Sequence, residues 1–218
     1  QYLYGVNEQY KTGDDVYTLG SFDDGTTYND YINASIWDAG GTDTISWAGQ
    51  TTVASINLGA GSFCFFGNIT GTDSEELDDT AFEPGSGLLG VGYNVVIENA
   101  IGGSNIDAIV GNSVANTLYG GAGSGVKDTL TGNAGADIFV CSLLDAVTDA
   151  TFADVITDFV NGTDLIGLED RTYSDLTISD SGSDTKIIDT NSSKILFVLQ
   201  SFDHTLIDIA DFVVTDFV

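Results

Sequence analysis

The chain has 218 residues, with 33 Asp and Glu against 5 Lys and Arg, so that its formal net charge is -28. This charge excludes a nucleic-acid-binding protein, because neutralising a phosphate backbone takes Lys and Arg, and it argues against docking on anionic lipid. Since 42% of the residues are hydrophobic and 11% are aromatic, the chain can still bury a core. We therefore expect a folded protein whose carboxylates bind a divalent cation.

Short strands and tight turns are the expected local structure. β-branched and aromatic runs lie close to Gly, Asn or Asp, which is typical of strands joined by turns. These runs are residues 43–47, 54–58 and 94–97. Weak helices are expected at 29–35, around 143–152 and at 207–212, and a surface loop is expected in the acidic stretch 72–87. No stretch is long and apolar enough for a transmembrane helix, so we expect no membrane insertion.

A nine-residue repeat begins at Gly102 and ends at Val140. Its units are GGSNIDAIV, GNSVANTLY, the longer GGAGSGVKDTLT and GNAGADIFV. They follow the template G-G-x-G-x-D-x-U-x, in which U is a large apolar residue. The acidic position holds Asp107, Asn116, Asp128 and Asp137, and the apolar position holds Ile109, Leu118, Leu130 and Phe139.

The repeat predicts a flattened coil in which each unit makes half a turn, so that units two apart stack. Glycines at the first positions allow φ > 0, which turns carbonyl oxygens inward, and the Asp adds a carboxylate oxygen. Such oxygen-rich shells suit Ca²⁺. Asp107 should then pair with the unit of Asp128, and Asn116 with that of Asp137, although the insertion at 124–126 leaves the assignment of Asp128 open. A coil held by Gly turns and Asn ladders, without an ion, is the alternative interpretation.

The repeat is similar to the RTX nonapeptide, and the chain resembles the C-terminal domain of serralysin-type zinc metallopeptidases. The matching segments follow the order of the family; they are 11–17 (KTGDDVY), 36–44 (IWDAGGTDT), 56–58 (INL), 97–103 (IENAIGG) and 158–166 (DFVNGTDLI). The resemblance implies an all-β fold, a parallel β-roll packed with and capped by antiparallel β-sandwich strands. It implies a single domain over 1–218, with an N-terminal β part (1–101), the repeats (102–140) and a C-terminal β cap with a secretion signal (141–218).

The resemblance also implies several calcium ions and their ligands. One site ties the N-terminal segment to the roll and another lies close to it; the matching residues are Lys11, Gly13, Asp15, Asp38, Gly40, Gly41 and Asp43, with Val96 and Glu98 for the second. In the roll, one set is Gly103, Asn105 and Asp107 with Gly120, Ala122 and Asp128, and the other is Asn112, Val114 and Asn116 with Gly132, Ala134 and Asp137. The family has Arg in place of Lys11 and usually Thr in place of Asp15 and Val96. A ligand that is a backbone carbonyl is kept despite those changes, whereas a ligand that is a Thr hydroxyl is lost.

No catalytic residue is predicted in this chain. The peptidase motif of the family is H-E-x-x-H-x-x-G-x-x-H, whereas the chain has a single histidine, His204, which we expect to be a surface or capping residue. Zinc is expected only in a catalytic domain preceding Gln1, a partner that the resemblance implies. The C-terminal DFVVTDFV, residues 211–218, resembles the uncleaved signal read by type I secretion machinery. A plain edge strand is the other interpretation.

The predicted function is that of the calcium-binding, non-catalytic C-terminal domain of a secreted, extracellular serralysin-like metalloprotease, serving calcium-dependent folding, stability and type I secretion. Two alternatives stay open: a free-standing adhesion or surface-assembly module, which would self-associate on adding calcium, and a polysaccharide-binding module. Cys64 and Cys141 are compatible with one disulfide or with two buried thiols. Trp37 and Trp47 are expected to pack in the core.

Overall fold

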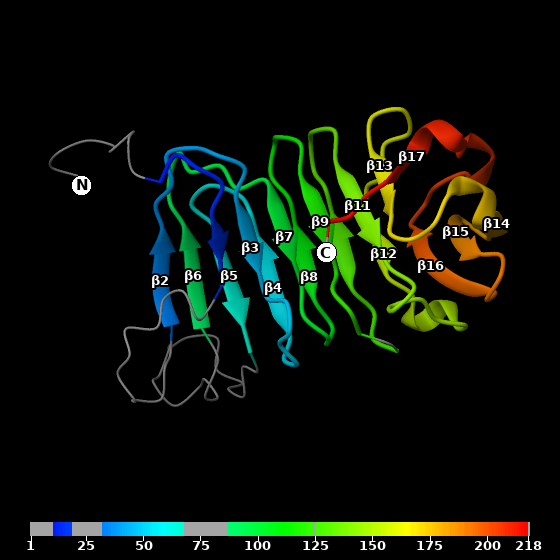
Figure 1. Cartoon of the computed structure of the whole chain (residues 1–218), viewed down its shortest axis with the longest axis horizontal. Coiled ribbons are helices and arrows are strands. Elements are labelled where there is room, and N and C mark those ends of the chain that lie inside the picture. Colours follow the sequence, from blue (N-terminus) through cyan, green and yellow to red (C-terminus); the bar gives the residue numbers. More distant parts are fainter. Residues whose placement is uncertain (1–10, 19–31, 68–86, 124, 218) are drawn as a thin grey trace, which may run out of the picture.

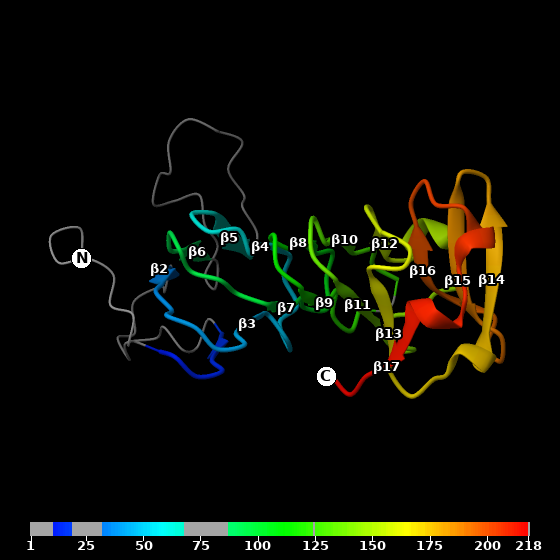
Figure 2. The same ribbon diagram turned by 90° about the horizontal axis from the view of Figure 1, so that it is seen from above.

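Two β-sheets face each other in the computed structural model, which describes residues 11–18, 32–67, 87–123 and 125–217 (Figure 1). The acidic loop predicted at 72–87 lies outside these residues except for Gly87, and so do the first residues of the helix predicted at 29–35. The sheets lie on opposite sides of one core, as the view along their strands shows (Figure 2).

Within the described residues, sheet A has seven strands and sheet B has ten. In spatial order, sheet A contains β1 (Val16–Tyr17), β3 (Thr44–Ser46), β7 (Asn99–Ile101), β9 (Thr117–Tyr119), β11 (Ile138–Cys141), β13 (Leu165–Leu168) and β17 (Phe212–Val214). Sheet B contains β14 (Leu176–Ser181), β15 (Asp184–Asp189), β16 (Lys194–Leu199), β12 (Val155–Ile156), β10 (Thr129–Thr131), β8 (Ala108–Val110), β4 (Ala54–Asn57), β5 (Phe63–Phe66), β6 (Gly87–Val91) and β2 (Ile32–Ile36).

The chain coils by alternating between the two sheets. From β7 to β13 successive strands belong to sheets A and B in turn, and each strand pairs in parallel with the strand one full turn later. Ala108 lies opposite Thr129 and Thr117 lies opposite Ile138, so units two apart stack, as the repeat predicts. The parallel pairing is not confined to residues 102–140, because β1 already pairs in parallel with β3, and β12 and β13 pair in parallel with β16 and β17.

The apolar residue of each repeat forms the centre of the core. Ile109, Leu118, Leu130 and Phe139 are all 0% exposed. Each is the second residue of its strand, so its immediate neighbours point outward while it points toward the opposite sheet, joined in β11 by Cys141. One short strand per half turn is therefore enough to fill the space between the sheets.

Antiparallel strands flank the roll on both sides. β14, β15 and β16 form an antiparallel meander at one end of sheet B, and β4, β5 and β6 form another toward the other end. The predicted fold class, a parallel β-roll capped by antiparallel strands, is confirmed. The C-terminal strand β17 pairs in parallel with β13 and forms one edge of sheet A.

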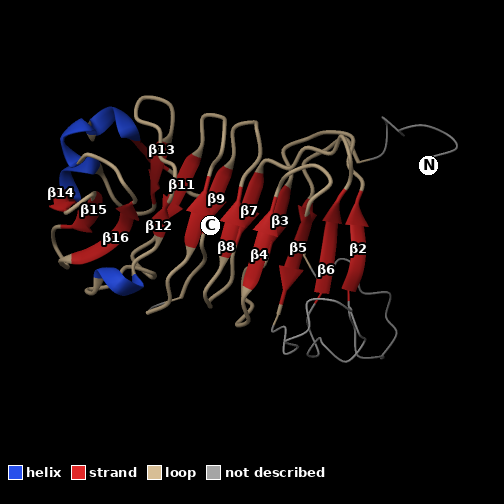
Figure 3. Ribbon diagram, turned by 180° about the vertical axis from the view of Figure 1, so that it is seen from behind, coloured by secondary structure: helices blue, strands red, loops and turns tan. Residues whose placement is uncertain are grey.

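The predicted helices are wrong in the described residues. Residues 32–36 form β2, because they pair in register with β6. Around 143–152 only a 3₁₀ turn forms, at Ala150–Phe152, and at 207–212 a 3₁₀ turn at Ile209–Asp211 leads into β17. Two further 3₁₀ turns are Tyr173–Asp175 and His204–Leu206. The helical turns gather at the C-terminal end of the roll (Figure 3), where Asp149, Asp203 and Asp208 cap three of them.

Four smaller expectations have clear outcomes. Cys64 and Cys141 are free and buried, so they form no disulfide. Trp47 is 2% exposed, and its indole nitrogen donates to the Thr52 carbonyl over 2.9 Å. His204 begins a 3₁₀ turn and is partly exposed, as predicted for a surface residue. In the described part of the chain no helix is long and apolar enough to cross a membrane.

Candidate metal centres

A column of aspartates runs along the start of the strands of sheet B. The Asp107 backbone N–H donates to Oδ1 of Asp128 over 2.7 Å, and the Asp128 N–H donates to Oδ1 of Asp154 over 2.8 Å. We call these three residues the B column. They are 1%, 2% and 8% exposed. Because the register of β8, β10 and β12 is fixed by the core, the carboxylates follow one another at one position of consecutive turns.

Sheet A carries a matching column. The Asn116 N–H donates to Oδ1 of Asp137 over 2.8 Å, and the Asp137 N–H donates to Oδ1 of Asp164 over 3.0 Å. We call Asn116, Asp137 and Asp164 the A column. The amide of Asn116 is already satisfied by protein: its Oδ1 accepts from the Asn112 N–H over 2.8 Å, and its Nδ2 donates to the Glu98 carbonyl over 3.0 Å. Asn116 is therefore a neutral and largely occupied member of its column.

Glycines allow the backbone of one turn to lie close to the carbonyl oxygens of the neighbouring turn. A Cβ at Gly102 would overlap the Gly120 carbonyl oxygen, and a Cβ at Gly121 would overlap that of Gly103. In the other set, a Cβ at Gly135 would overlap the Val114 carbonyl oxygen, and its φ of 145° is one that glycine adopts readily. The carbonyls of the predicted ligands Gly103, Gly120 and Val114 thus lie at the contacts between stacked loops. Only a chain without side chains at these points allows the approach.

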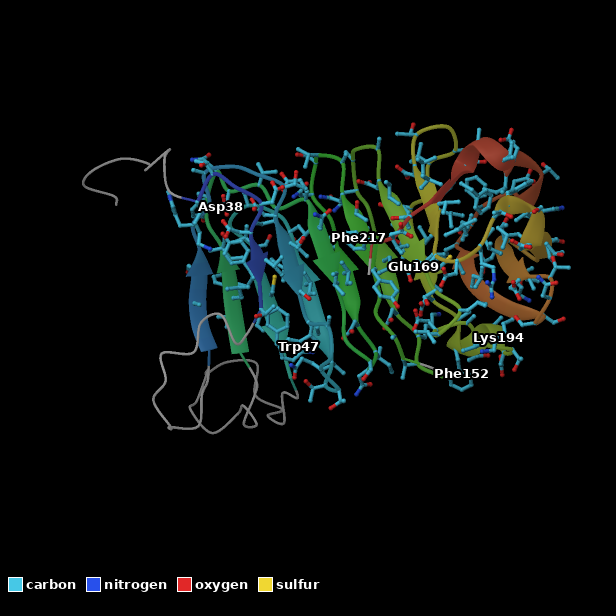
Figure 4. All side chains as sticks on the ribbon, in the orientation of Figure 1. Asp38, Trp47, Phe152, Glu169, Lys194 and Phe217 are labelled. Atoms are coloured by element: carbon cyan, nitrogen blue, oxygen red, sulfur yellow. The ribbon has the colours of Figure 1, made fainter. Side chains whose placement is uncertain are left out.

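A third cluster lies at the start of sheet A near the N-terminal end. Asp15, Asp38 and Asp43 each have a carboxylate oxygen within 4.8 Å of the other two. The Asp15 N–H donates to Oδ1 of Asp43 over 2.8 Å, and the Asp43 N–H donates to Oε2 of Glu98 over 2.8 Å. Tyr17 donates its hydroxyl to Asp38. Asp38 lies at the top edge of the roll in the view of Figure 4, whereas Trp47, at the other end of β3, lies at the bottom.

The remaining predicted residues of this cluster surround it. The Lys11 carbonyl accepts from the Ala39 N–H over 3.0 Å, and the Gly40 N–H donates to Oδ1 of Asp38 over 2.9 Å. A Cβ at Gly41 would overlap the Gly13 carbonyl oxygen. Val96 lies two residues before Glu98, with its side chain 43% exposed. The segments predicted to share an ion, 11–15 and 38–43, are therefore in contact, and Glu98 of the second predicted site is hydrogen-bonded to Asp43.

The roll loops differ in how far their other predicted ligands are occupied. The Asn105 side chain bonds to the Thr51 carbonyl and to the Ile106 N–H, so both of its functional groups have partners. Asn112 likewise donates to the Ile97 carbonyl and accepts from the Val114 N–H. Gly132 donates its N–H to Asp158, and Ala122 and Ala134 are exposed loop residues.

In the part of the chain that the structure describes, two buried carboxylate oxygens have no hydrogen-bond partner. They are Oδ2 of Asp43 and Oδ2 of Asp137, which belong to residues 0% and 1% exposed. Among the described residues, the ion pairs are Lys11 with Asp15, Arg171 with Asp189 and His204 with Asp203, so neither oxygen has a cationic neighbour in contact. A buried charge without a partner is costly. All candidate ligand atoms here are oxygens, and Ca²⁺ prefers oxygen ligands, so the residues fit this metal.

Burial raises the pKa of the acids in both columns and in the third cluster. The pKa of Asp43, Asp107 and Asp137 is raised to about 6, chiefly by desolvation, with further repulsion from acids nearby for Asp43 and Asp137. Desolvation and the charge of Asp154 raise the pKa of Asp128 to about 9. Burial raises that of Asp154 to about 7, although Lys127 lowers it. Without a metal ion, the fold therefore favours the protonated form of these side chains over the ionised form.

The repeat did not predict Asp154, Asp158 or Asp164. Asp154 continues the B column 26 residues after Asp128, and Asp164 continues the A column 27 residues after Asp137. Both carboxylate oxygens of Asp158 accept from the backbone of residues 132 and 133. A nine-residue period cannot find these positions. The available signal was the segment DFVNGTDLI, which contains Asp158 and Asp164.

The fold and the acidic columns define a two-sheet parallel β-roll with candidate cation sites between its turns. A family model described as Peptidase M10 serralysin C terminal matches residues 6–215. The chain belongs to this family of serralysin C-terminal domains.

Known relatives match half of the chain. Serralysin of Proteus mirabilis is 38% identical over 123 residues, which is 54% of this chain and 22% of that protein. Serralysin C of Dickeya chrysanthemi is 41% identical over 115 residues, 50% of this chain and 21% of that protein. The matched part is thus about a fifth of the length of these relatives. The solution structure of the AlgE6R3 subunit of the Azotobacter vinelandii mannuronan C5-epimerase matches with a TM-score of 0.31 and 20% identity, covering 53% of this chain and 77% of that one.

Proposed function

We propose that this chain is the calcium-folded, non-catalytic C-terminal domain of a longer secreted zinc metallopeptidase. Membership of the serralysin C-terminal family supports the assignment to such a protein. The domain supplies folding, stability and export, and the catalytic zinc site belongs to a domain that precedes it. The single histidine of this chain, His204, has no part in that site.

The observation that carries the proposal is the pair of unpartnered carboxylate oxygens on Asp43 and Asp137. Each lies among further acids, Asp38 and Glu98 in one case and Asp158 and Asp164 in the other, whose charges raise its pKa. A calcium ion at each place would neutralise two charges and supply the missing partner. Without the ion, repulsion and desolvation oppose folding.

The ion set follows from the stacked loops. The proposed ligands in the roll are the carbonyl and side-chain oxygens of residues 103, 105 and 107 with 120, 122 and 128, and of residues 112, 114 and 116 with 132, 134 and 137. The acids Asp154, Asp158 and Asp164 extend the candidate set beyond the repeats. Because Asn116 is neutral and hydrogen-bonded to protein, we expect the site that includes it to be the weaker one in the roll.

Export is coupled to folding in this proposal. The segment that resembles a type I signal includes β17, which is paired with β13, and the Thr215 N–H donates to the Leu168 carbonyl over 3.1 Å. Phe217 lies over the outer side of sheet A near β9 and β11 (Figure 4). Residues Phe212–Val214 of this segment are therefore part of the folded sheet, so a transporter that reads the segment has to act before calcium folds the roll. Low cytosolic calcium keeps the chain unfolded, and extracellular calcium exceeds the roughly 10⁻⁴–10⁻³ M affinity of extracellular modules.

The test is a calcium titration of the 218-residue chain followed by circular dichroism and thermal unfolding. We expect less ordered β-structure and a lower Tm after chelation, and a Tm that rises with calcium, since an ion that binds only the folded state adds about 2.7 kcal/mol per site at 100 times its Kd. Magnesium at equal concentration should do much less, because it demands octahedral geometry and holds its water. An unchanged β-spectrum and Tm in excess chelator would overturn the proposal.

A further inference from the structure

The outer face of sheet B carries no carboxylate on five consecutive strands, in a chain with 33 acids. Residues Ile56, Ile109, Leu130, Ile156 and Leu199 of these strands are 0% exposed and point into the core. Their neighbours therefore point outward. The outward residues are Ser55 and Asn57, Ala108 and Val110, Thr129 and Thr131, Val155 and Thr157, and Val198 with Gln200 just beyond its strand. Val155 and Val198 are 8% and 7% exposed, because they pack in a second apolar cluster with Val147 and Ala153. This face is seen from its own side in Figure 3.

Two phenylalanines extend the same face. Phe63 and Phe65 on β5 are 53% and 36% exposed, while Cys64 and Phe66 between and after them are buried. Phe65 lies opposite Ser55, which places both rings on the outer side of the sheet next to the polar rows. Exposed aromatic rings on an otherwise polar face are a common mark of a binding surface.

A cleft of about 260 Å³ lies at the opposite end of these rows. Ser181 and Asp184, which flank the turn between β14 and β15, line this cleft together with Gln200, Thr157 and Lys127. Lys127 makes no hydrogen bond or ion pair with any residue in the described part of the chain. The cleft thus offers ammonium and amide donors, a carboxylate acceptor and hydroxyls that serve as both.

The spacing of these groups suits a chain laid across the strands. From Phe63 on β5 to Gln200 beyond β16 there are five strand-to-strand steps, or about 24 Å at the usual separation of about 4.8 Å. Each step is close to the length of one sugar ring in an extended polysaccharide. We propose that the outer face of sheet B binds a neutral polysaccharide, with Phe63 and Phe65 stacking on sugar rings and Lys127, Asp184 and Gln200 bonding to hydroxyls in the cleft.

Electrostatics selects a neutral ligand over an acidic one. The formal charge of -28 repels a polyanion at long range. Within the cleft Lys127 and Asp184 supply one charge of each sign, so no excess positive charge attracts a uronate. Hydroxyl and amide groups run along the whole face, from Ser55 to Gln200, and such groups can bond to the hydroxyls of a sugar chain. The inference is independent of any upstream peptidase.

The experiment is affinity electrophoresis of the calcium-loaded 218-residue chain in native gels. The gels contain one of four polymers: hydroxyethylcellulose, galactomannan, laminarin or polygalacturonate. We expect retardation by at least one neutral polymer, and at least a tenfold rise in its apparent Kd in the double variant Phe63→Ala/Phe65→Ala. Gln200→Ala, at the other end of the face, should weaken the same interaction severalfold.

Leu144→Ala is the matched control, because Leu144 is 71% exposed and lines a groove at sheet A instead. It should leave retardation unchanged. The Tm in calcium of every variant shows whether the fold is kept. Three results would overturn the proposal: no retardation by any neutral polymer, retardation by polygalacturonate alone, or equal retardation of the wild type, the double phenylalanine variant and Gln200→Ala.

Discussion

The backbone N–H of Asp107 donates to the carboxylate of Asp128 over 2.7 Å, although the two residues are 21 positions apart in sequence. Asp128 makes the same bond to Asp154 one turn further on. The carboxylate of each buried acid is therefore next to the backbone of the acid one turn earlier. Each further turn of the roll adds one more carboxylate beside those already buried. The core fixes the register, and the register concentrates charge that only a cation, or a proton, can neutralise.

Replacing Asp137 by Ala should have opposite effects with and without calcium. In calcium the variant loses a ligand, so its Tm should rise less on titration and its calcium midpoint should increase severalfold. In chelator the loss of a buried charge that repels Asp164 offsets the loss of the acceptor for the Asn116 N–H, so we expect little loss of stability, or a gain. Thermal unfolding in both conditions measures the crossover. Asp180→Asn, at an exposed residue, is the control; equal Tm losses in both conditions for Asp137→Ala would contradict a ligand role.

The metal-free domain should be more stable at pH 5 than at pH 8. Asp43, Asp107 and Asp137 have a pKa of about 6 in the fold against an ordinary value of 3.8. Between these values the folded state binds more protons than the unfolded chain, so stability falls as pH rises from about 4 to about 6. Asp154, with a pKa of about 7, extends the fall.

Calcium should reverse this trend, because it binds the ionised carboxylates and competes with protons. Chemical unfolding of desalted, metal-free protein and of calcium-loaded protein, each from pH 5 to pH 8, checks both slopes. If the free energy of unfolding changed with pH in the same way in the two series, the buried acids would not be calcium ligands.

Gly135→Ala should disturb a candidate ion site, whereas Gly182→Ala should disturb only a turn. Both glycines have positive φ, 145° and 82°, so both variants carry a backbone cost on the order of 1–3 kcal/mol. A Cβ at Gly135 also overlaps the Val114 carbonyl oxygen, whereas one at Gly182 meets nothing. We expect Gly135→Ala to lower the calcium-induced rise in Tm and Gly182→Ala to leave that rise unchanged. If calcium raised the Tm of the two variants equally, the Val114 carbonyl would not be a calcium ligand.

The sequence predicts the roll well because its local and global patterns agree. Leu118 and Phe139 occupy the same place in their units and are both fully buried. The insertion before Asp128 does not break the pairing, because it is absorbed in the loop before β10. The predicted helix at 29–35 failed where it is described, because β2 is stabilised by its pairing with β6, which no local pattern reports.

The candidate site is predicted in part for the same reason. Asp107 and Asp137 follow the nine-residue period, whereas Asp154 and Asp164 follow turns of 26 and 27 residues. These longer turns include connections of irregular length, so stacking and not spacing brings the acids together. That Oδ2 of Asp43 and of Asp137 accept no hydrogen bond is likewise a property of packing, which the sequence does not contain.

The two thiols should report calcium-dependent folding in separate parts of the roll. Cys64 lies on β5 and Cys141 on β11, and both are buried and free. Burial raises the pKa of Cys64 to about 11 and that of Cys141 further, so neither forms a reactive thiolate near pH 8 in the fold. We expect both to resist iodoacetamide in calcium and to react after chelation, as followed by mass spectrometry. The variants Cys64→Ala and Cys141→Ala assign the rates, and urea-unfolded protein gives the limit for free reaction. If both thiols stayed protected in chelator, the strands around them would hold without calcium, and the ion would serve only local loops.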